Sequence, residues 1–391
     1  MKSKEVNSSR MPVYRDAGFE LYDAGITAGA FEKEKDPERE PDHYIYSRYR
    51  NPTVVSAENE IMKLEGSEWA LLTQSGMSAI EIALSIFQHG REKRPWLFFT
   101  EIYGGTISFI ETVLIKRRGL DIHYFTPQKA GYDLREFEKT IDQLKPELVY
   151  VETISNPMVI VSDIAEIIRI AGKYSCRVVV DNTFATPMLY KPLNNGADMV
   201  IHSATKYLSG HGNISAGVIC GNDHRLMQES LEYRKFVGHM ISPDDAYRLQ
   251  TQMETFSLRF SHQCSNAAKL AEFFHGSDRV RQVWYPGLAD HSTFDVAKKL
   301  FGVKGFGGMI TFDLDGKDGN HKREKRDKFI RMVSEKIKLI PTLGDYKTIL
   351  MPVEAVWGVK YPEPGMIRIS VGFEEYDELI ETISRAMSSL N

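Results

Sequence analysis

The stretch that decides the fold begins apolar and ends polar: ADMVIHSATKYLSGHG, residues 197–212. Two stretches upstream have the same form, LVYVE at 148–152 and RVVVDNT at 177–183. Such runs are typical of buried parallel strands, and open α/β sheets bind ligands beyond the carboxyl ends of their strands. We therefore expect one crevice to be lined by the polar residues at these ends, namely Glu152, Asp181, Ser203, Thr205 and Lys206.

An acid and a lysine delivered to one crevice match the needs of pyridoxal 5'-phosphate (PLP). A lysine amine forms the Schiff base with this cofactor, and a carboxylate keeps the pyridine nitrogen protonated so that the ring accepts electrons. Asp181 and Lys206 suit these two roles, and the hydroxyls of Ser203 and Thr205 suit the phosphate. A lone lysine is usually a surface charge and a lone aspartate often caps a helix, so the prediction depends on the combination.

Length and composition indicate an ordinary globular protein. With 391 residues the chain is long enough for two or more domains. Its net charge of −4 gives no reason to expect nucleic acid or a membrane surface as a partner. Cys176, Cys220 and Cys264 have no metal-ligand spacing, so we expect buried thiols and no metal site. Without a signal-peptide core or a membrane-spanning apolar run, we expect a cytoplasmic protein.

The N-terminal part contains two unusual segments. The charge run at 32–42 is typical of a solvated loop. The segment YIYSRYRNPT at 44–53 combines three tyrosines with two arginines. Tyr46 and Arg48 could form a phosphate clamp, because arginine forks onto phosphate oxygens and tyrosine donates beside it. A partly buried amphipathic segment is the alternative.

Two turns further along the chain could also serve the crevice. Residues 70–87 show the pattern of a strand, a glycine-containing turn and a helix. The N–H groups of Gly76 and Met77 could then form an anion site, or the turn could be a simple connection. Tyr103 precedes two glycines, which permit close approach of the backbone to a ligand. This tyrosine either lies flat on an aromatic ligand or belongs to the core.

Patterning along the chain predicts an N-terminal arm and two domains. Strand and helix patterns alternate up to about residue 245, which favours parallel crossovers. The remaining chain reads as α+β, so we expect an arm at 1–48, a large domain at 49–245 and a small C-terminal domain at 246–391. In the small domain Arg368 lies between isoleucines in a predicted strand. It needs a partner, either a substrate carboxylate or a structural ion pair.

Eight motifs in chain order resemble the cysteine and methionine metabolism family of PLP enzymes, which contains cystathionine γ-synthase, cystathionine γ-lyase and methionine γ-lyase. The motifs are YSR with NPT (46–53), SGMS (75–78), YGGT (103–106), Glu152 with NP (156–157), DNTF (181–184), HS with TKY (202–207), TLG (342–344) and RISVG (368–372). The resemblance implies an α/β structure of PLP fold type I, similar to aspartate aminotransferase, with a mostly parallel central sheet.

The resemblance also implies roles for the motif residues. Lys206 would bond to the cofactor, Asp181 would pair with the pyridine nitrogen, and Tyr103 would stack on the ring; these three are the expected catalytic residues. Asn156 would lie near the cofactor's phenolic oxygen. The remaining cofactor contacts would come from Gly76, Met77, Thr183, Ser203 and Thr205, and the substrate contacts from Arg368, Thr342 and Asn156.

The resemblance implies an assembly as well. In this family the positions of Tyr46 and Arg48 reach the phosphate of the neighbouring subunit, so a monomer would lack a complete site. The usual assembly is a homotetramer built as a dimer of dimers.

The expected function is cleavage of a C–S bond at Cγ or Cβ of a sulfur amino acid such as cystathionine or methionine. The alternative is a γ-replacing transferase, either cystathionine γ-synthase or an O-acylhomoserine sulfhydrylase. A non-catalytic scaffold would not require both Asp181 and Lys206. A nicotinamide-dependent oxidoreductase would require Gly-x-Gly-x-x-Gly after the first strand, where QSGMS (74–78) stands instead.

The sequence departs from the family pattern around the expected substrate. Thr342 stands where serine is usual, and VEAVW (353–357) replaces a familiar Thr-His pair. Lys347 stands where a glutamate is common. Because Lys347 reverses a charge near the expected entrance, we expect it to weaken the preference for a cationic distal group such as that of cystathionine.

Overall fold

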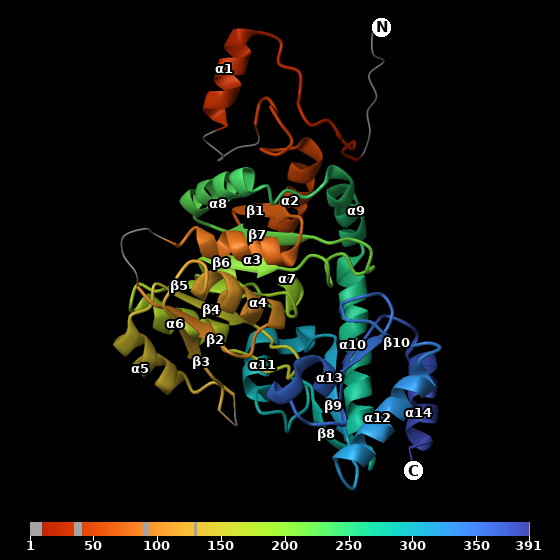
Figure 1. Ribbon diagram of the computed structural model, residues 1–391. Coiled ribbons are helices and arrows are strands. Elements are labelled where there is room, and N and C mark those ends of the chain that lie inside the picture. The colour runs from red at the N-terminus through yellow and green to blue at the C-terminus, as the bar shows by residue number, and fades with distance from the viewer. Residues whose placement is uncertain (1–9, 35–40, 89–93, 129–130, 391) are drawn as a thin grey trace.

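Two β-sheets, each packed with helices, form the body of the molecule, and an N-terminal arm extends from it (Figure 1). The computed structural model describes residues 10–34, 41–88, 94–128 and 131–390. Residues 35–40, within the charge run that was expected to be a solvated loop, lie outside these ranges. Among the described residues, no helix is both long and apolar enough to cross a bilayer.

The first sheet has seven strands in the order β1-β7-β6-β5-β4-β2-β3. They are β1 (Trp69–Thr73), β2 (Trp96–Phe99), β3 (Ile122–Phe125), β4 (Leu148–Glu152), β5 (Arg177–Asp181), β6 (Met199–His202) and β7 (Gly217–Gly221). β7 runs antiparallel to both its neighbours, whereas every other pair is parallel. The predicted mostly parallel α/β sheet is therefore confirmed.

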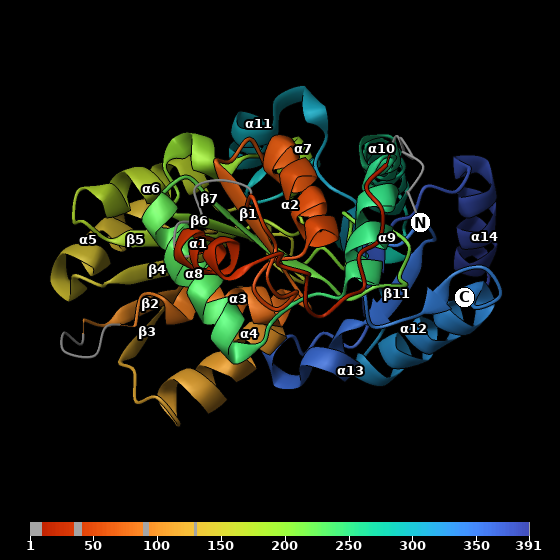
Figure 2. The same ribbon diagram turned by 90° about the horizontal axis from the view of Figure 1, so that it is seen from above.

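Helices cover both faces of this sheet (Figure 2), and all residues of β1, β2, β4, β6 and β7 are buried. Burial on both faces explains the nearly continuous apolar runs in the sequence. The α-helices of this part of the chain are α1 (Ala24–Lys33), α2 (Pro52–Glu65), α3 (Gly76–Ser85), α4 (Gly104–Phe109), α5 (Leu134–Leu144), α6 (Ile164–Gly172), α7 (Thr186–Leu189) and α8 (His224–Val237).

The second sheet has five strands in the order β10-β11-β12-β9-β8. They are β8 (Val280–Trp284), β9 (Met309–Leu314), β10 (Lys338–Leu339), β11 (Ile349–Pro352) and β12 (Met366–Ser370). The helices of this part are α9 (Pro243–Met253), α10 (Phe256–His275), α11 (Phe294–Phe301), α12 (Gly319–Val333), α13 (Val353–Trp357) and α14 (Tyr376–Ser388). The C-terminal part is thus α+β, although the predicted boundary at 245/246 falls inside α9 and stays a prediction.

The helix α10 links the cores of the two parts. Its first half, with Phe256 and Phe260, packs into the core of the first sheet, and its second half, with Leu270 and Phe274, packs into the core of the second. In Figure 1 it runs from α9 down to β8 and β9. The two sheets are therefore connected by one continuous helix rather than by a loose linker.

One helix of the arm has no apolar stripe that could reveal it in the sequence. The arm contains the helix α1, although the sequence showed no strong periodicity there; only Ala30 of this helix is buried, so no apolar stripe marks it. Its start was signalled by Asp23, whose carboxylate caps the N–H groups of Gly25 and Ile26.

Candidate active site

The crevice predicted beyond the strand ends is a cavity of about 250 Å³ between the two sheets. It is lined by all five residues expected there, Glu152, Asp181, Ser203, Thr205 and Lys206. Glu152 and Asp181 are paired neighbours on the parallel strands β4 and β5, so their side chains leave the same edge of the sheet. The far wall comes from the C-terminal part, through Pro341, Leu343 and other residues.

Asp181 lies at the back of the cavity as a buried acid. Its Oδ1 accepts hydrogen bonds from the Thr183 backbone N–H, at 3.0 Å, and from the Thr183 hydroxyl, at 2.5 Å. The Tyr150 hydroxyl donates to Oδ2 at 3.3 Å. Burial raises the pKa of Asp181, although the two bonds from Thr183 lower it. None of the ion pairs in the described part of the chain includes Asp181, so this acid is available to a cationic ligand atom.

Glu152 supports Tyr103 from the neighbouring strand. Its Oε1 accepts the backbone N–H of Tyr103 at 2.5 Å. Burial, together with the nearby charge of Asp181, raises the pKa of Glu152 well above its usual range. The Tyr103 ring is half-exposed and lies against Gly105, where an added Cβ would be 2.4 Å from the ring's Cε1. Gly105 therefore leaves room for the Tyr103 ring, and the stacking of this ring on an aromatic ligand stays a prediction.

Lys206 points across the cavity toward the C-terminal part. Its Nζ donates to the Oγ1 of Thr342 at 2.8 Å. Burial lowers the pKa of Lys206 to about 8, and the charge of Arg368 contributes. A substantial fraction of this amine is therefore neutral near physiological pH, as a nucleophile or base requires.

Arg368 and Asn156 form a second polar group in the cavity. Arg368 donates from Nη1 to the Asn156 side-chain oxygen and from Nη2 to the Thr342 carbonyl, both at 2.9 Å. Its Nε lies buried without a hydrogen-bond partner. Burial lowers the pKa of Arg368 to about 10. The ion pairs in the described ranges give Arg368 no carboxylate partner, which leaves the guanidinium ready for an anionic ligand.

The N-terminal end of α3 faces Ser203 at another wall of the cavity. The first N–H groups of a helix have no partner within the helix, so Gly76 and Met77 present donors there. A Cβ on Gly76 would lie 2.9 Å from both Cβ and Oγ of Ser203, so only glycine fits this approach. The Thr205 hydroxyl now donates to the Ala216 carbonyl at 3.1 Å, and it would have to turn to bind a ligand.

Two predicted site residues lie elsewhere. Tyr46 and Arg48 do not line this cavity; they belong to the arm, where the Arg48 Nη1 donates to the Lys235 carbonyl at 2.8 Å. The Arg48 guanidinium also lies 5.4 Å from the centre of the Tyr46 ring. Lys347 is exposed, with its ammonium 5.5 Å from the Tyr346 ring, and does not line the cavity either.

Sequence reasoning missed several lining residues: Ser75, Ile80, Ile154, Phe184, Ser215, Pro341 and Leu343. A signal existed for Ser75, because serine before a helix start is a common N-cap and its Oγ accepts the N–H of Ser78 at 3.1 Å. Pro341 and Leu343 flank a residue that was predicted. For the apolar residues no local signal existed, because they resemble any other core position.

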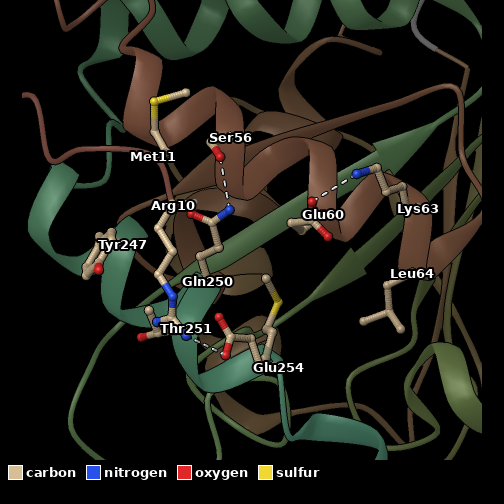
Figure 3. A pocket seen from close by; sticks show the side chains of 11 residues that line it. Arg10, Met11, Ser56, Glu60, Lys63, Leu64, Tyr247, Gln250, Thr251 and Glu254 are labelled. Carbon is tan, nitrogen blue, oxygen red and sulfur yellow. Dashed lines mark hydrogen bonds and ion pairs between the residues drawn. The ribbon is translucent and has the colours of Figure 1, made fainter. Parts of the chain in front are cut away.

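A larger hollow lies near the arm, between α2 and α9 (Figure 3). The charged side chains there already bind one another: Arg10 pairs with Glu254 at 3.0 Å and Lys63 with Glu60 at 2.9 Å. Gln250 donates to Ser56 at 2.9 Å. This hollow therefore lacks the available acid, lysine and arginine that the smaller cavity contains.

Comparisons with known proteins agree with this geometry. The sequence model of the Cys/Met metabolism PLP-dependent enzymes matches residues 1–388. The chain belongs to this family. It is 33% identical to a cystathionine beta-lyase from Lactococcus lactis subsp. cremoris over 358 residues, which are 89% of each chain. It is 34% identical to an L-methionine gamma-lyase from Pseudomonas putida, covering 97% of this chain and 92% of that one.

A solved structure agrees as well. Cystathionine gamma synthase from Xanthomonas oryzae pv. oryzae, in complex with cystathionine, superimposes with a TM-score of 0.84 at 27% identity, over 97% of this chain and 92% of that chain. The predicted family, PLP as its cofactor and a PLP-enzyme fold are confirmed.

The cavity of this Cys/Met metabolism enzyme fits PLP. Asp181 is a buried acid that forms no ion pair with the residues that the structure describes, as the protonated pyridine nitrogen requires. Gly76 lies at a helix start and approaches Ser203 without a side chain of its own, and the free N–H groups of a helix start suit a phosphate. Lys206 is the amine that would hold the cofactor covalently. Because the Asn156 oxygen accepts from Arg368, its amide N–H groups remain as donors for the phenolic oxygen.

Proposed function

We propose that the protein is a PLP-dependent lyase that cleaves the C–S bond at Cγ or Cβ of a sulfur amino acid such as cystathionine or methionine. With uptake of water, the products would be a 2-oxo acid, ammonia and a thiol. The observation that supports this most directly is the convergence of Asp181, Lys206 and Arg368 on one cavity. An acid for the ring, an amine for proton transfer and a guanidinium for the α-carboxylate are what an α-amino acid needs there.

Each residue would act through its own chemistry. Bound PLP supplies an electron sink for negative charge at the substrate's Cα. Asp181 maintains the positive charge of the pyridine nitrogen, and Arg368 binds the carboxylate and so orients the Cα–H bond. Lys206, whose amine would be free once the substrate is bound, would take the Cα proton; Tyr103 is the alternative base. Loss of a Cβ proton then permits expulsion of a thiol from Cγ.

Thr342 would contact the Lys206 amine as well as the substrate carboxylate. Its hydroxyl accepts from Lys206 while its carbonyl accepts from Arg368. One residue thus sets the distance between the group that moves the proton and the group that holds the substrate. This contact supports a role for Thr342 in orienting Lys206, in addition to the substrate contact expected from the sequence.

The second candidate is a γ-replacing transferase, either cystathionine γ-synthase or an O-acylhomoserine sulfhydrylase. The similarity to a cystathionine gamma synthase structure favours it. The early proton transfers at Cα and Cβ are the same for both reactions. They differ in whether a thiol adds at Cγ before the product leaves.

We also propose a homotetramer, as a dimer of dimers, in which Tyr46 and Arg48 complete the phosphate site of a neighbouring subunit. Their position on the arm, outside their own chain's cavity, supports this arrangement. The proposed division remains an arm at 1–48, a large domain at 49–245 and a small domain at 246–391. Three free, buried cysteines support a reducing, cytoplasmic location.

The decisive assay uses purified, PLP-loaded protein. We would measure 2-oxo acid and ammonia from methionine, homocysteine, cystathionine and cysteine separately, and then from O-acylhomoserine with cysteine. Oxo acid from a single amino acid supports the lyase, and Lys206→Ala should abolish it. Cystathionine formed only in the paired reaction would replace the lyase by the synthase. With cofactor bound, absence of turnover in every reaction would refute both the lyase and the cystathionine γ-synthase.

A further inference from the structure

The inference starts from the surroundings of the Arg368 guanidinium. Two of its nitrogens donate to Asn156 and to the Thr342 carbonyl, and its Nε lies buried without a partner. These contacts lie along the edges of the planar group. An arginine side chain has many rotamers, so packing on the face of its guanidinium can restrict its orientation beyond what these hydrogen bonds do.

Trp357 packs on that face. The guanidinium carbon of Arg368 lies 5.4 Å from the centre of the Trp357 ring, within the range of a cation–π contact. Contact with a ring on one face leaves the N–H groups at the edge free to bind a carboxylate. Trp357 itself packs against a small apolar cluster of Val353, Tyr361 and Met366. This packing restricts the position of the Trp357 ring.

The segment that carries Trp357 is fastened to the first sheet. The Lys360 ammonium donates to the Thr100 carbonyl at 2.8 Å and lies 3.4 Å from a Glu101 oxygen. The Tyr361 hydroxyl also donates to Glu101. Glu101 precedes the ring-bearing Tyr103 by two residues. One short segment of the C-terminal part therefore contacts both Arg368 and the loop that carries Tyr103.

We propose that Trp357 is a positioning residue for the substrate's α-carboxylate: its ring fixes the plane of the Arg368 guanidinium and keeps water from that face. The inference rests on the proposed function, since it assumes that Arg368 receives an amino-acid carboxylate. Fixing the plane lowers the entropy that binding must remove, and a dry face strengthens the charge–charge attraction. The sequence VEAVW at 353–357 then serves carboxylate binding from outside the cavity lining.

The test compares two probes that differ by a carboxylate, L-alanine and ethylamine. Each is titrated into PLP-loaded protein, and binding is followed by the absorbance of the bound cofactor. Trp357→Leu should weaken L-alanine binding by about five- to tenfold and leave ethylamine binding nearly unchanged. Trp357→Phe, which keeps a ring face, should restore most of the affinity. Trp284→Leu is the matched control, because Trp284 packs on the same apolar cluster.

Three results would overturn the proposal. They are unchanged L-alanine affinity in Trp357→Leu, equal weakening of both probes, and a Trp284→Leu variant as impaired for L-alanine as Trp357→Leu. Failure of the proposed function would look different. In that case the wild-type protein would bind L-alanine by its carboxylate but eliminate thiol from no sulfur amino acid.

Discussion

At the scale of single residues, the site depends on ionisable groups whose pKa values are shifted by burial. Asp181 is a buried acid whose pKa burial raises, and Lys206 is a buried amine whose pKa falls to about 8. Both shifts follow from loss of water around the charged form, and Arg368 adds repulsion at Lys206. A cationic ligand atom would stabilise the charged form of Asp181, and the neutral amine of Lys206 is the form that reacts with an aldehyde. Both shifts therefore favour binding of PLP.

The shifted lysine predicts how apoprotein captures PLP. Only the neutral amine is nucleophilic, and a pKa near 8 leaves roughly a tenth of it neutral at pH 7, against about three parts in ten thousand for an ordinary lysine. The capture rate should therefore rise with pH up to about 8 and then level off. Stopped-flow absorbance across pH 6 to 10 measures it. A rate that continues to rise toward pH 10 would contradict the lowered pKa.

The residues of this site differed in how far the sequence could predict them. Asp181 follows its apolar run directly and Lys206 follows a few residues after the next one, so the strand pattern itself placed them at one sheet edge. The hydrogen bond from Lys206 to Thr342 joins residues 136 positions apart, and no local pattern records such a contact. The packing of Trp357 on Arg368 was missed for the same reason, because it depends on how α13 folds back over β12.

At the scale of elements, α10 fixes the turn that carries Lys206. From α10, the Arg259 guanidinium donates to the carbonyls of Tyr207 and Leu208, at 3.2 and 3.1 Å. Gly210 has φ of +67°, and a Cβ there would lie 1.6 Å from the Arg259 Nη1. The helix and the glycine turn are therefore matched to each other. The sequence showed the glycine, but the matching arginine lies 49 residues later, by the difference of the two residue numbers.

Removing this arginine should cost stability. Arg259→Met leaves buried carbonyls without donors, so we expect the free energy of unfolding to fall by about 2–4 kcal/mol. Urea denaturation measures the loss. Arg248→Met is the control: Arg248 is exposed and donates to the Asn213 carbonyl at 3.2 Å, so its loss should change stability by less than about 0.5 kcal/mol. Equal losses in both variants would show that Arg259 has no special role.

The loop after β10 gives a second prediction at this scale. Lys347 is exposed and lies outside the cavity lining, so solvent screens its charge. Lys347→Glu should still raise the ratio of kcat/KM for cystathionine to that for methionine, but by less than about threefold. Paired kinetic assays at low and high salt measure it. Higher cystathionine activity in wild type than in the variant would refute the expected charge effect.

Some features of the elements could not be predicted from sequence patterns. All residues of β7 are buried, so it has no polar face that would reveal its antiparallel direction. The helix α1 buries a single alanine and has no stripe to detect. By contrast, α6 buries Ile164, Ile167 and Ile168, a spacing that forms the apolar stripe of an amphipathic helix.

At the scale of the whole molecule, the arm and the cavity of one chain are separate. Tyr46 and Arg48 hold a ring–guanidinium contact on the arm, while the phosphate-side residues Gly76 and Ser203 line the cavity. The proposed assembly explains the separation, because the arm of one chain would reach the cavity of the next. Isologous dimers make such exchange reciprocal.

Subunit mixing tests this exchange. Arg48→Ala and Lys206→Ala should each be nearly inactive alone. In a mixed dimer, one site would carry both substitutions and the other neither. Co-refolding equal amounts should therefore restore about a quarter of wild-type activity, since half of the dimers are mixed and half of their sites are intact. Two Lys206→Ala preparations mixed with each other are the control. No recovery in the mixed sample would place Arg48 in its own chain's site.

The position of Arg368 and Thr342 late in the chain has a consequence for synthesis on the ribosome. Asp181, Ser203 and Lys206 leave the ribosome first, and Arg368 follows 162 residues after Lys206, by the difference of their numbers. At ordinary elongation rates this interval lasts roughly 8 to 30 seconds. A nascent or truncated chain without Arg368 would have its own cofactor-binding residues Asp181, Ser203 and Lys206, but it would lack the guanidinium proposed to bind the substrate carboxylate. The yellow colour of bound PLP in a preparation would therefore not show that the chains are full-length and able to bind substrate.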